Sequence, residues 1–122
     1  MKSRGFLCLS ATIVCTAVLF AGCAESNVGF DDLQKGDYAA ARDQLAPLQA
    51  ESPHDPYLEL NLGWAYQNLG RMDLAEPLYR GALTDGRNIV PAQTTKPDFR
   101  GKTIAEIACA NLRAGLNNPS AC

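Results

Sequence analysis

The spacing of apolar residues changes once along the chain and divides it into two parts. From Gly5 to Phe20 the residues are almost continuously apolar, interrupted only by Ser10, Thr12 and Thr16. Beyond this segment apolar residues recur at intervals of three and four, which is the period of an amphipathic helix. No run shows the alternation that indicates a half-buried strand. The pattern predicts an all-α domain behind an apolar N-terminal segment.

Two copies of one helical pattern lie within this domain. The first copy opens at Gly36 and the second at Gly70, 34 residues later. In each copy a stripe of residues follows at positions i, i+3, i+7 and i+10, which lie on one face of a helix. The stripes are Tyr38, Ala41, Leu45 and Leu48 in the first copy and Met72, Ala75, Tyr79 and Ala82 in the second.

A further helix is predicted ahead of each copy. Asp55 and Pro56 are an N-cap followed by proline at the first helical position, where the missing N–H costs nothing. The helix that they begin stops at Gly70 and carries one apolar face, made of Leu58, Leu62, Ala65 and Leu69. The equivalent helix ahead of the first copy is short, covering residues 28–35. The repeating unit is therefore a helix, a glycine turn and a second helix.

The chain then departs from the repeat. Residues 87–102 contain Pro91, Pro97 and Gly101 and form a link too long for an ordinary connection between helices. We interpret this link as an insertion, in which Phe99 is expected to dock onto the helices.

One more helix is predicted after the insertion. Thr103 and Glu106 have the spacing of a capping box, in which each side chain accepts a hydrogen bond from a free backbone N–H. Gly115 ends the helix, and its apolar stripe is Ile104, Ile107, Ala108 and Leu112. Because repeat arrays need about three units to bury a continuous core, this helix is expected to act as a cap.

A helical hairpin repeated at 34 residues resembles the tetratricopeptide repeat. The residues that carry the resemblance are Asn61, Leu62, Gly63, Ala65, Tyr66, Gly70, Ala75, Tyr79, Ala82 and Leu83 in the second unit, and Gly36, Asp37, Tyr38, Ala41 and Pro53 in the first. The resemblance implies a short tetratricopeptide-like helical-hairpin solenoid over residues 28–86. Residues 87–122 are then the insertion loop and a C-terminal capping helix.

Six residues of the helix that begins at Pro56 lie off its core stripe and follow each other at three- or four-residue spacing, so they share a face. They are Tyr57, Leu60, Asn61, Trp64, Gln67 and Asn68. The resemblance implies that this face lines the concave groove in which such repeats hold an extended peptide or a partner helix. Tryptophan and tyrosine often anchor interfaces. The alternative is that the insertion or the C-terminal helix covers Trp64 and makes it part of the core.

The N-terminal segment has the order of a secretory signal, with Lys2 and Arg4 ahead of the apolar run. A membrane-spanning helix needs about 20 apolar residues, and this run is shorter. The run ends in Leu19, Phe20, Ala21, Gly22 and Cys23. This ending resembles the bacterial lipoprotein signal, in which an aliphatic residue and two small residues precede a cysteine.

The lipoprotein resemblance implies that residues 1–22 are removed and that Cys23 carries lipid at the new N-terminus, with residues 23–27 as a tether. Several acyl chains bind a bilayer far more firmly than one. Ala24, in place of aspartate, implies sorting to the outer membrane, with the domain in the periplasm. The alternative is an ordinary signal peptide, with Cys23 as a disulfide partner.

The chain contains five cysteines. Cys8 and Cys15 lie in the segment that is expected to be removed, and Cys23 is expected to carry lipid. Cys109 and Cys122 remain, and two cysteines in the oxidising periplasm are expected to form one disulfide.

The sequence offers little for catalysis or metal binding. His54, the only histidine, lies in the predicted loop between the repeats, where a polar surface residue is the common outcome. No cysteine and histidine spacing fits a zinc site, and Cys109 with His54 as nucleophile and base lacks an orienting third group. The formal net charge of −2 does not suggest nucleic acid as a partner. We expect no enzyme activity, cofactor, metal or small-molecule substrate.

Together these features predict an outer-membrane lipoprotein that acts as a periplasmic scaffold and binds another envelope protein in its groove. It looks similar to the repeat-bearing lipoproteins that accompany pilus and secretion systems, including tight-adherence pili, and this similarity implies an assembly factor. The alternative is a structural accessory of the envelope without a dedicated client. An open aromatic face favours the first function, and a covered face favours the second.

Overall fold

The computed structural model describes residues 28–122, which form a purely helical domain. In chain order the elements are α2 (Phe30–Lys35), α3 (Tyr38–Glu51), α4 (Pro56–Asn68), α5 (Met72–Asp85), the short 3₁₀ turn η2 (Pro97–Phe99) and α6 (Ile104–Gly115). None of the described residues lies in a strand. The prediction of an all-α solenoid of helical hairpins with a C-terminal capping helix is confirmed.

Two predicted features lie outside the described residues. These are the signal segment of residues 1–22 and the tether that begins at Cys23. Within residues 28–122, no helix has the length and apolar character that crossing a membrane requires.

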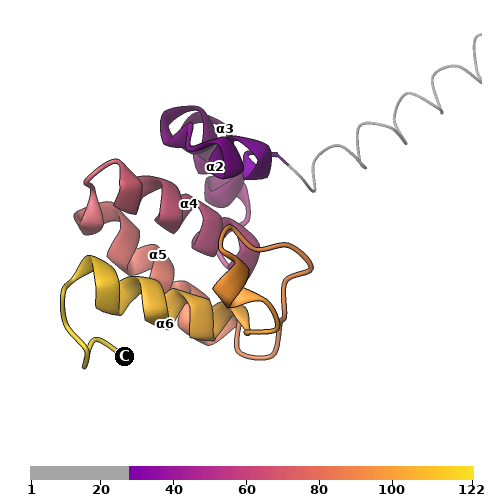
Figure 1. Cartoon of the computed structure of the whole chain (residues 1–122). Coiled ribbons are helices and arrows are strands. Elements are labelled where there is room, and N and C mark those ends of the chain that lie inside the picture. Colours follow the sequence, from indigo (N-terminus) through magenta and orange to yellow (C-terminus); the bar gives the residue numbers. More distant parts are fainter. Residues whose placement is uncertain (1–27) are drawn as a thin grey trace, which may run out of the picture.

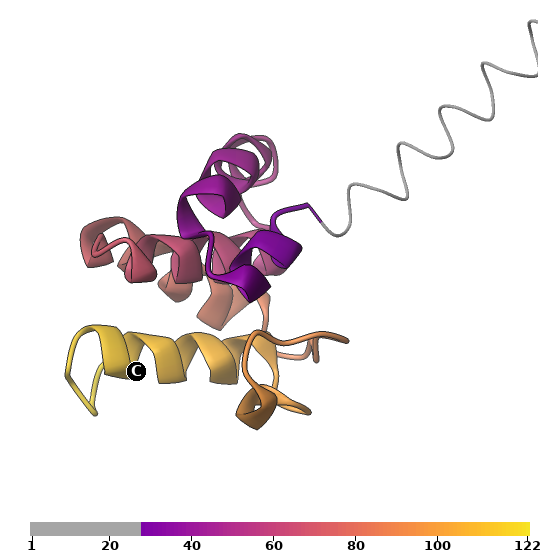
Figure 2. The same ribbon diagram turned by 45° about the horizontal axis from the view of Figure 1, so that its top comes forward.

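The helices pack against one another in the order of the chain (Figure 1). α3 contacts both α2 and α4, and α4 in turn contacts α5. α6 packs mainly against α5 and also reaches α4. Figure 2 shows α6 running along the α4–α5 hairpin, with the insertion loop at one end of it. The capping helix therefore covers the side of the second hairpin that the first hairpin leaves open.

Local chemistry explains where the main helices begin and end. The carboxylates of Asp37 and Asp55 accept hydrogen bonds from backbone N–H groups in the first turns of α3 and α4, as N-cap residues do. Gly36 and Gly70, at equivalent places in the two copies, have φ angles of 79° and 75°. Glycine adopts these left-handed angles without strain, so both turns were readable in the sequence.

The first helix is shorter than predicted. It begins at Phe30 rather than at residue 28, because Gly29 has a φ of 77° and a left-handed residue interrupts a right-handed helix. Gly29 also gives Leu45 its place in the core, since a Cβ atom at position 29 would lie 2.7 Å from Cγ of Leu45.

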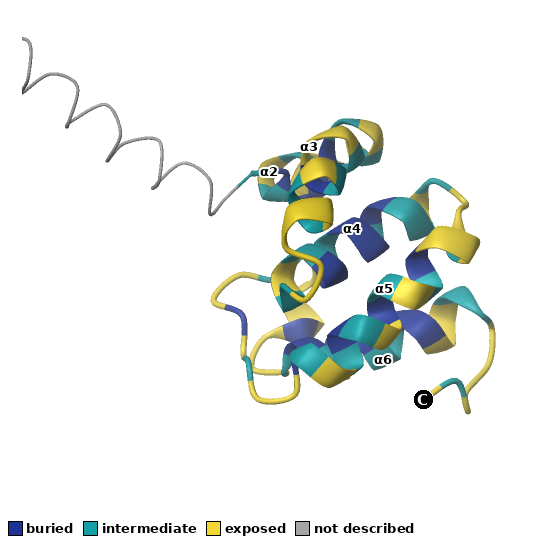
Figure 3. Cartoon of the chain, turned by 180° about the vertical axis from the view of Figure 1, so that it is seen from behind, coloured by how far each residue is buried: buried dark blue, intermediate teal, exposed yellow. Residues whose placement is uncertain are grey.

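The buried side chains form two clusters along the facing sides of the helices (Figure 3). The cluster between α2, α3 and α4 consists of Leu33, Ala41, Leu45, Leu62 and Ala65. The cluster between α4, α5, η2 and α6 consists of Leu60, Ala75, Tyr79, Ala82, Phe99, Ile104, Ile107, Ala108 and Leu112. Tyr66 packs against both. The second cluster contains the whole predicted stripe of α6 and confirms that Phe99 docks onto the helices.

A capping box and a disulfide hold α6 in place. At its start the predicted capping box is confirmed: the Glu106 carboxylate accepts from the Thr103 backbone N–H at 2.7 Å, and the Thr103 hydroxyl oxygen accepts from the Glu106 N–H at 3.2 Å. Beyond α6 the chain turns back along the helix (Figure 1). There Cys122 and Cys109 form a disulfide with their Cα atoms 5.8 Å apart.

We expect this disulfide to stabilise the folded domain. Replacing both Cys109 and Cys122 with alanine should lower the free energy of unfolding by about 3 kcal/mol, because the bond restricts an unfolded loop of about 14 residues. Urea unfolding of the variant and of the wild type measures the difference, and the reduced wild type should behave like the variant. Two free thiols in the mass spectrum of non-reduced protein from an oxidising compartment would contradict the bond.

Candidate functional site

A cavity of about 270 Å³ opens on the side of the domain formed by α2, α4, α6 and the insertion. Phe30, Tyr57, Trp64 and Phe99 line it, and we refer to it as the aromatic cavity. Residues 91–95 of the insertion form a further wall, and no residue that lines the cavity is charged. An uncharged, aromatic recess of this kind accepts apolar groups.

Four of the six residues predicted to form the groove line this cavity. They are Tyr57, Leu60, Asn61 and Trp64. Gln67 does not line it, and its side-chain oxygen accepts a hydrogen bond of 2.7 Å from the hydroxyl of Tyr79. Burial raises the pKa of Tyr79, so this hydroxyl stays protonated and can donate. Asn68 also lies outside the cavity, and its side chain donates to the backbone oxygen of Trp64 at 2.8 Å.

The expectation that Leu60 lies off the core is wrong. Leu60 is only 8% exposed and belongs to the same buried cluster as Phe99 and Ile107. The reason is that α6 and the insertion cover this side of α4. The apolar period of α4 alone contains no information about that cover.

The exposure of Trp64 is intermediate between the two alternatives that the sequence left open, a free groove and a covered side chain. Its side chain is half-buried, and its ring meets the ring of Tyr38 edge-on with the centroids 6.5 Å apart. Nζ of Lys96 lies 4.4 Å from the centroid of the Trp64 ring and 5.4 Å from that of Phe99, within the range of cation–π attraction. The insertion therefore covers part of Trp64, whereas Tyr57 remains 44% exposed.

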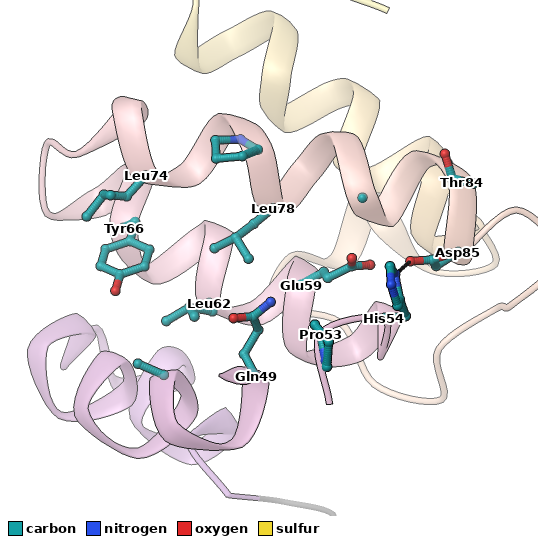
Figure 4. A pocket seen from close by; sticks show the side chains of 13 residues that line it. Gln49, Pro53, His54, Glu59, Leu62, Tyr66, Leu74, Leu78, Thr84 and Asp85 are labelled. Atoms are coloured by element: carbon teal, nitrogen blue, oxygen red, sulfur yellow. Dashed lines mark hydrogen bonds and ion pairs between the residues drawn. The ribbon is translucent and has the colours of Figure 1, made fainter. Parts of the chain in front are cut away.

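A second cavity, of about 660 Å³, lies between α3, α4 and α5 (Figure 4). At one end of it His54 from the loop before α4, Glu59 from α4 and Asp85 from the end of α5 converge, and we refer to these three residues as the acid–histidine cluster. His54 Nδ1 lies 3.3 Å from Asp85 Oδ2. One nitrogen or oxygen from each residue lies within 4.8 Å of the other two.

Glu59 is the buried member of this cluster. It is 4% exposed, and its Oε2 atom has no hydrogen-bond partner among the described residues. Burial is the main reason that the pKa of Glu59 is raised to about 7; the negative charge of Asp85 raises this pKa further, and the charge of His54 lowers it. The carboxylate lies so close to α5 that a Cβ atom at Gly81 would collide with it.

The sequence-based predictions include no role for Glu59 or Asp85, and they place His54 on the surface, where it lies. One signal was available for Glu59. It precedes the buried Leu62 and Gly63 by three and four residues, so it shares their side of the helix. A carboxylate at such a position indicates a buried charge, which rarely occurs without a partner or a function.

The chain was also compared with known proteins. A family model described as tetratricopeptide repeat matches residues 32–92, which is half of the chain and extends from α2 into the insertion. No curated protein and no solved structure matches the chain.

The variant Glu59→Gln is expected to stabilise the domain above neutral pH. With a raised pKa, the folded protein holds a proton that the unfolded chain has already lost. The contribution of this carboxyl group to stability is therefore complete below about pH 4.5 and is lost as the pH rises to about 7. Glutamine resembles the protonated carboxyl group at every pH, so the variant does not lose this stability as the pH rises.

Urea unfolding in metal-free buffer tests this prediction. At about pH 8 the free energy of unfolding of Glu59→Gln should exceed that of the wild type by about 1 to 3 kcal/mol, and the two should converge toward pH 4.5. The exposed Asp98→Asn is the control and should show no gain that depends on pH. A difference between Glu59→Gln and the wild type that stays constant with pH would contradict the raised pKa.

Proposed function

Because the chain belongs to the tetratricopeptide repeat family, we propose that it is a scaffold of the cell envelope that binds another envelope protein in the aromatic cavity. Repeats of this family generally serve as protein interaction modules. The observation that carries the proposal is the exposed Tyr57 beside the half-buried Trp64 at an uncharged cavity. Aromatic residues in such positions are frequent anchors of interfaces.

The size of the cavity fits one side chain of a partner protein. At about 270 Å³ it lies just below the range of roughly 300–1,000 Å³ that small-molecule pockets occupy. Asn61 and Gln93 line it, and each amide side chain offers both donors and acceptors. An extended peptide satisfies both features, because one apolar side chain can enter the cavity while the amides pair with the peptide backbone.

The proposal includes a lipid anchor on Cys23 at the periplasmic face of the outer membrane. Its support is the sequence from Leu19 to Cys23, followed by Ala24. From Cys23 to Phe30, the first residue of α2, an extended chain covers at most about 25 Å. A client in the aromatic cavity is therefore bound close to the membrane surface.

In its narrowest form the proposal is an assembly role in a pilus or secretion system, such as a tight-adherence pilus. This form rests on the similarity of the anchor and the repeats to the lipoproteins of those systems. The protein would then hold a subunit of the system at the membrane during assembly.

A structural accessory without a dedicated client is the second candidate. The observation that favours it is the position of Lys96 over the rings of Trp64 and Phe99. If this contact persists in solution, the insertion fills the place of a client. The two candidates differ in whether Trp64 becomes accessible.

Photo-crosslinking in intact cells is expected to identify the client. A photoreactive amino acid in place of Tyr57 should crosslink to one envelope protein, because this side chain lies at the mouth of the aromatic cavity. The same amino acid in place of Val90 should not, since Val90 is 53% exposed but does not line the cavity. Lys96→Ala should keep or increase the crosslink from position 57, because it uncovers Trp64 without removing a buried side chain.

Trp64→Ala should reduce the same crosslink by about tenfold or more, the effect of losing an anchor residue. Equal crosslinking from positions 57 and 90 would contradict the cavity as the binding site. A crosslink only to a second copy of the chain, or none from either position, would favour the structural accessory.

Cys23 is expected to incorporate an alkyne fatty acid in growing cells, and the labelled protein should fractionate with the outer membrane. Cys23→Ser should abolish the label and release the domain, because the thiol is the proposed site of acylation. Cys15→Ser is the matched control and should leave the label unchanged. An unlabelled wild-type protein, soluble in the periplasm, would contradict the anchor.

A further inference from the structure

The acid–histidine cluster has the properties of a metal site that lies on a different side of α4 from the aromatic cavity. We propose that His54, Glu59 and Asp85 together bind a divalent transition-metal ion, with Zn²⁺ as the best match. This inference does not rest on the binding of a client protein.

The spacing of the three side chains fits one ion. Ligand atoms about 2.0–2.1 Å from a tetrahedral Zn²⁺ lie roughly 3.4 Å from each other. His54 Nδ1 and Asp85 Oδ2 are already 3.3 Å apart, and atoms of all three residues lie within 4.8 Å of one another. Small rotations of the side chains therefore suffice to bring three ligands onto a single ion.

The unpartnered carboxylate oxygen is the independent observation that points to a ligand. Glu59 is 96% buried, since its exposure is 4%, and Oε2 accepts no hydrogen bond from the described residues. A buried polar atom without a partner is costly for the folded state. The Glu59 side chain extends from α4 toward His54 and Asp85 (Figure 4), which is where a cation would satisfy it.

The local charge favours a cation. Asp85 is the last residue of α5, and the C-terminal end of a helix carries partial negative charge. Asp55 adds a further carboxylate whose charge acts on Glu59. Among residues 28–122, no lysine or arginine forms an ion pair with Glu59 or Asp85.

The cluster also has an entrance and room for a water ligand. The side chain of His54 is 86% exposed and that of Asp85 is 25% exposed, whereas Glu59 lies deepest. Three protein ligands with one open position are the usual arrangement of a zinc ion that keeps a water or exchanges ligands. The imidazole selects for Zn²⁺ and related transition metals over Mg²⁺ and Ca²⁺, which prefer oxygen ligands alone.

No ligand spacing reveals this site in the sequence, because the three residues come from three separate segments. His54 precedes α4, Glu59 lies within it, and Asp85 ends α5. They meet only because α4 and α5 pack closely, with Gly81 leaving the space that the Glu59 carboxylate occupies.

Calorimetric titration of Zn²⁺ into the oxidised full chain, purified in detergent, tests the proposal. We expect saturable binding of one ion per chain. Glu59→Gln and Asp85→Asn should each weaken the affinity by about 10- to 100-fold or more, since even residues that only support a metal ligand have effects of this size. Asp98→Asn, which removes an exposed carboxylate elsewhere, should bind like the wild type.

Thermal unfolding separates a lost ligand from a lost fold. The metal-free Glu59→Gln variant should melt at or above the wild-type temperature at neutral pH, and Zn²⁺ should raise the melting temperature of the wild type and of Asp98→Asn but not that of Glu59→Gln. Co²⁺ provides a second readout, because a tetrahedral site containing nitrogen and oxygen ligands gives intense visible absorption bands. These bands should appear with the wild type and with Asp98→Asn but not with Glu59→Gln.

Several outcomes would overturn the proposal. Absence of saturable binding would do so, and so would wild-type affinity in Glu59→Gln. If His54→Ala abolished binding while both carboxylate variants bound normally, the ion would be held by an exposed histidine alone. Equal affinity for Mg²⁺, Ca²⁺ and Zn²⁺ would exclude a site selective for transition metals.

Discussion

The packing of α6 against α5 is the interaction on which the rest of this domain depends. Each helical hairpin of a repeat array buries only part of its apolar surface, and neighbouring units must cover the remainder. Here two hairpins are present, and α6 covers the second with Ile104, Ile107 and Leu112. The capping box and the disulfide both act on this one helix, so the two local devices stabilise the element that completes the core.

The insertion connects the core with the aromatic cavity. Phe99 is buried in the cluster formed with α5 and α6, and Lys96, three residues earlier, lies over the ring of Trp64. Because Phe99 and Lys96 are only three residues apart, the packing that buries Phe99 also places Lys96 near the aromatic cavity.

α4 carries two chemically different surfaces. Glu59 and Trp64 are five residues apart, which places them roughly 140° from each other around a helix. One side presents an uncharged aromatic cavity and the other a buried carboxylate beside Asp85 and His54. The separation would let the proposed peptide and the proposed cation bind the same helix without competing for the same atoms.

The sequence by itself determined the helices and most of their limits, with the start of α2 at Phe30 as an exception. The period of the apolar residues, the N-caps at Asp55 and Thr103 and the turn glycines at Gly36 and Gly70 predicted the solenoid and its cap. These signals are readable because helix formation depends on groups within about four residues of each other along the chain. The composition of the insertion also predicted that Phe99 would dock onto the helices, because burial of a large apolar side chain is favourable.

Only the tertiary structure decided which residues beyond the predicted apolar stripes became core and which of them came together in a site. Leu60 follows the spacing of a surface face, yet α6 buries it. Gln67 lies on the predicted binding face, yet its side chain accepts a hydrogen bond from Tyr79. Glu59, Asp85 and His54 are distant in sequence, and the close approach of α4 and α5 brings them together. These outcomes depend on contacts between segments tens of residues apart, and the period of a single helix contains no information about what packs against it.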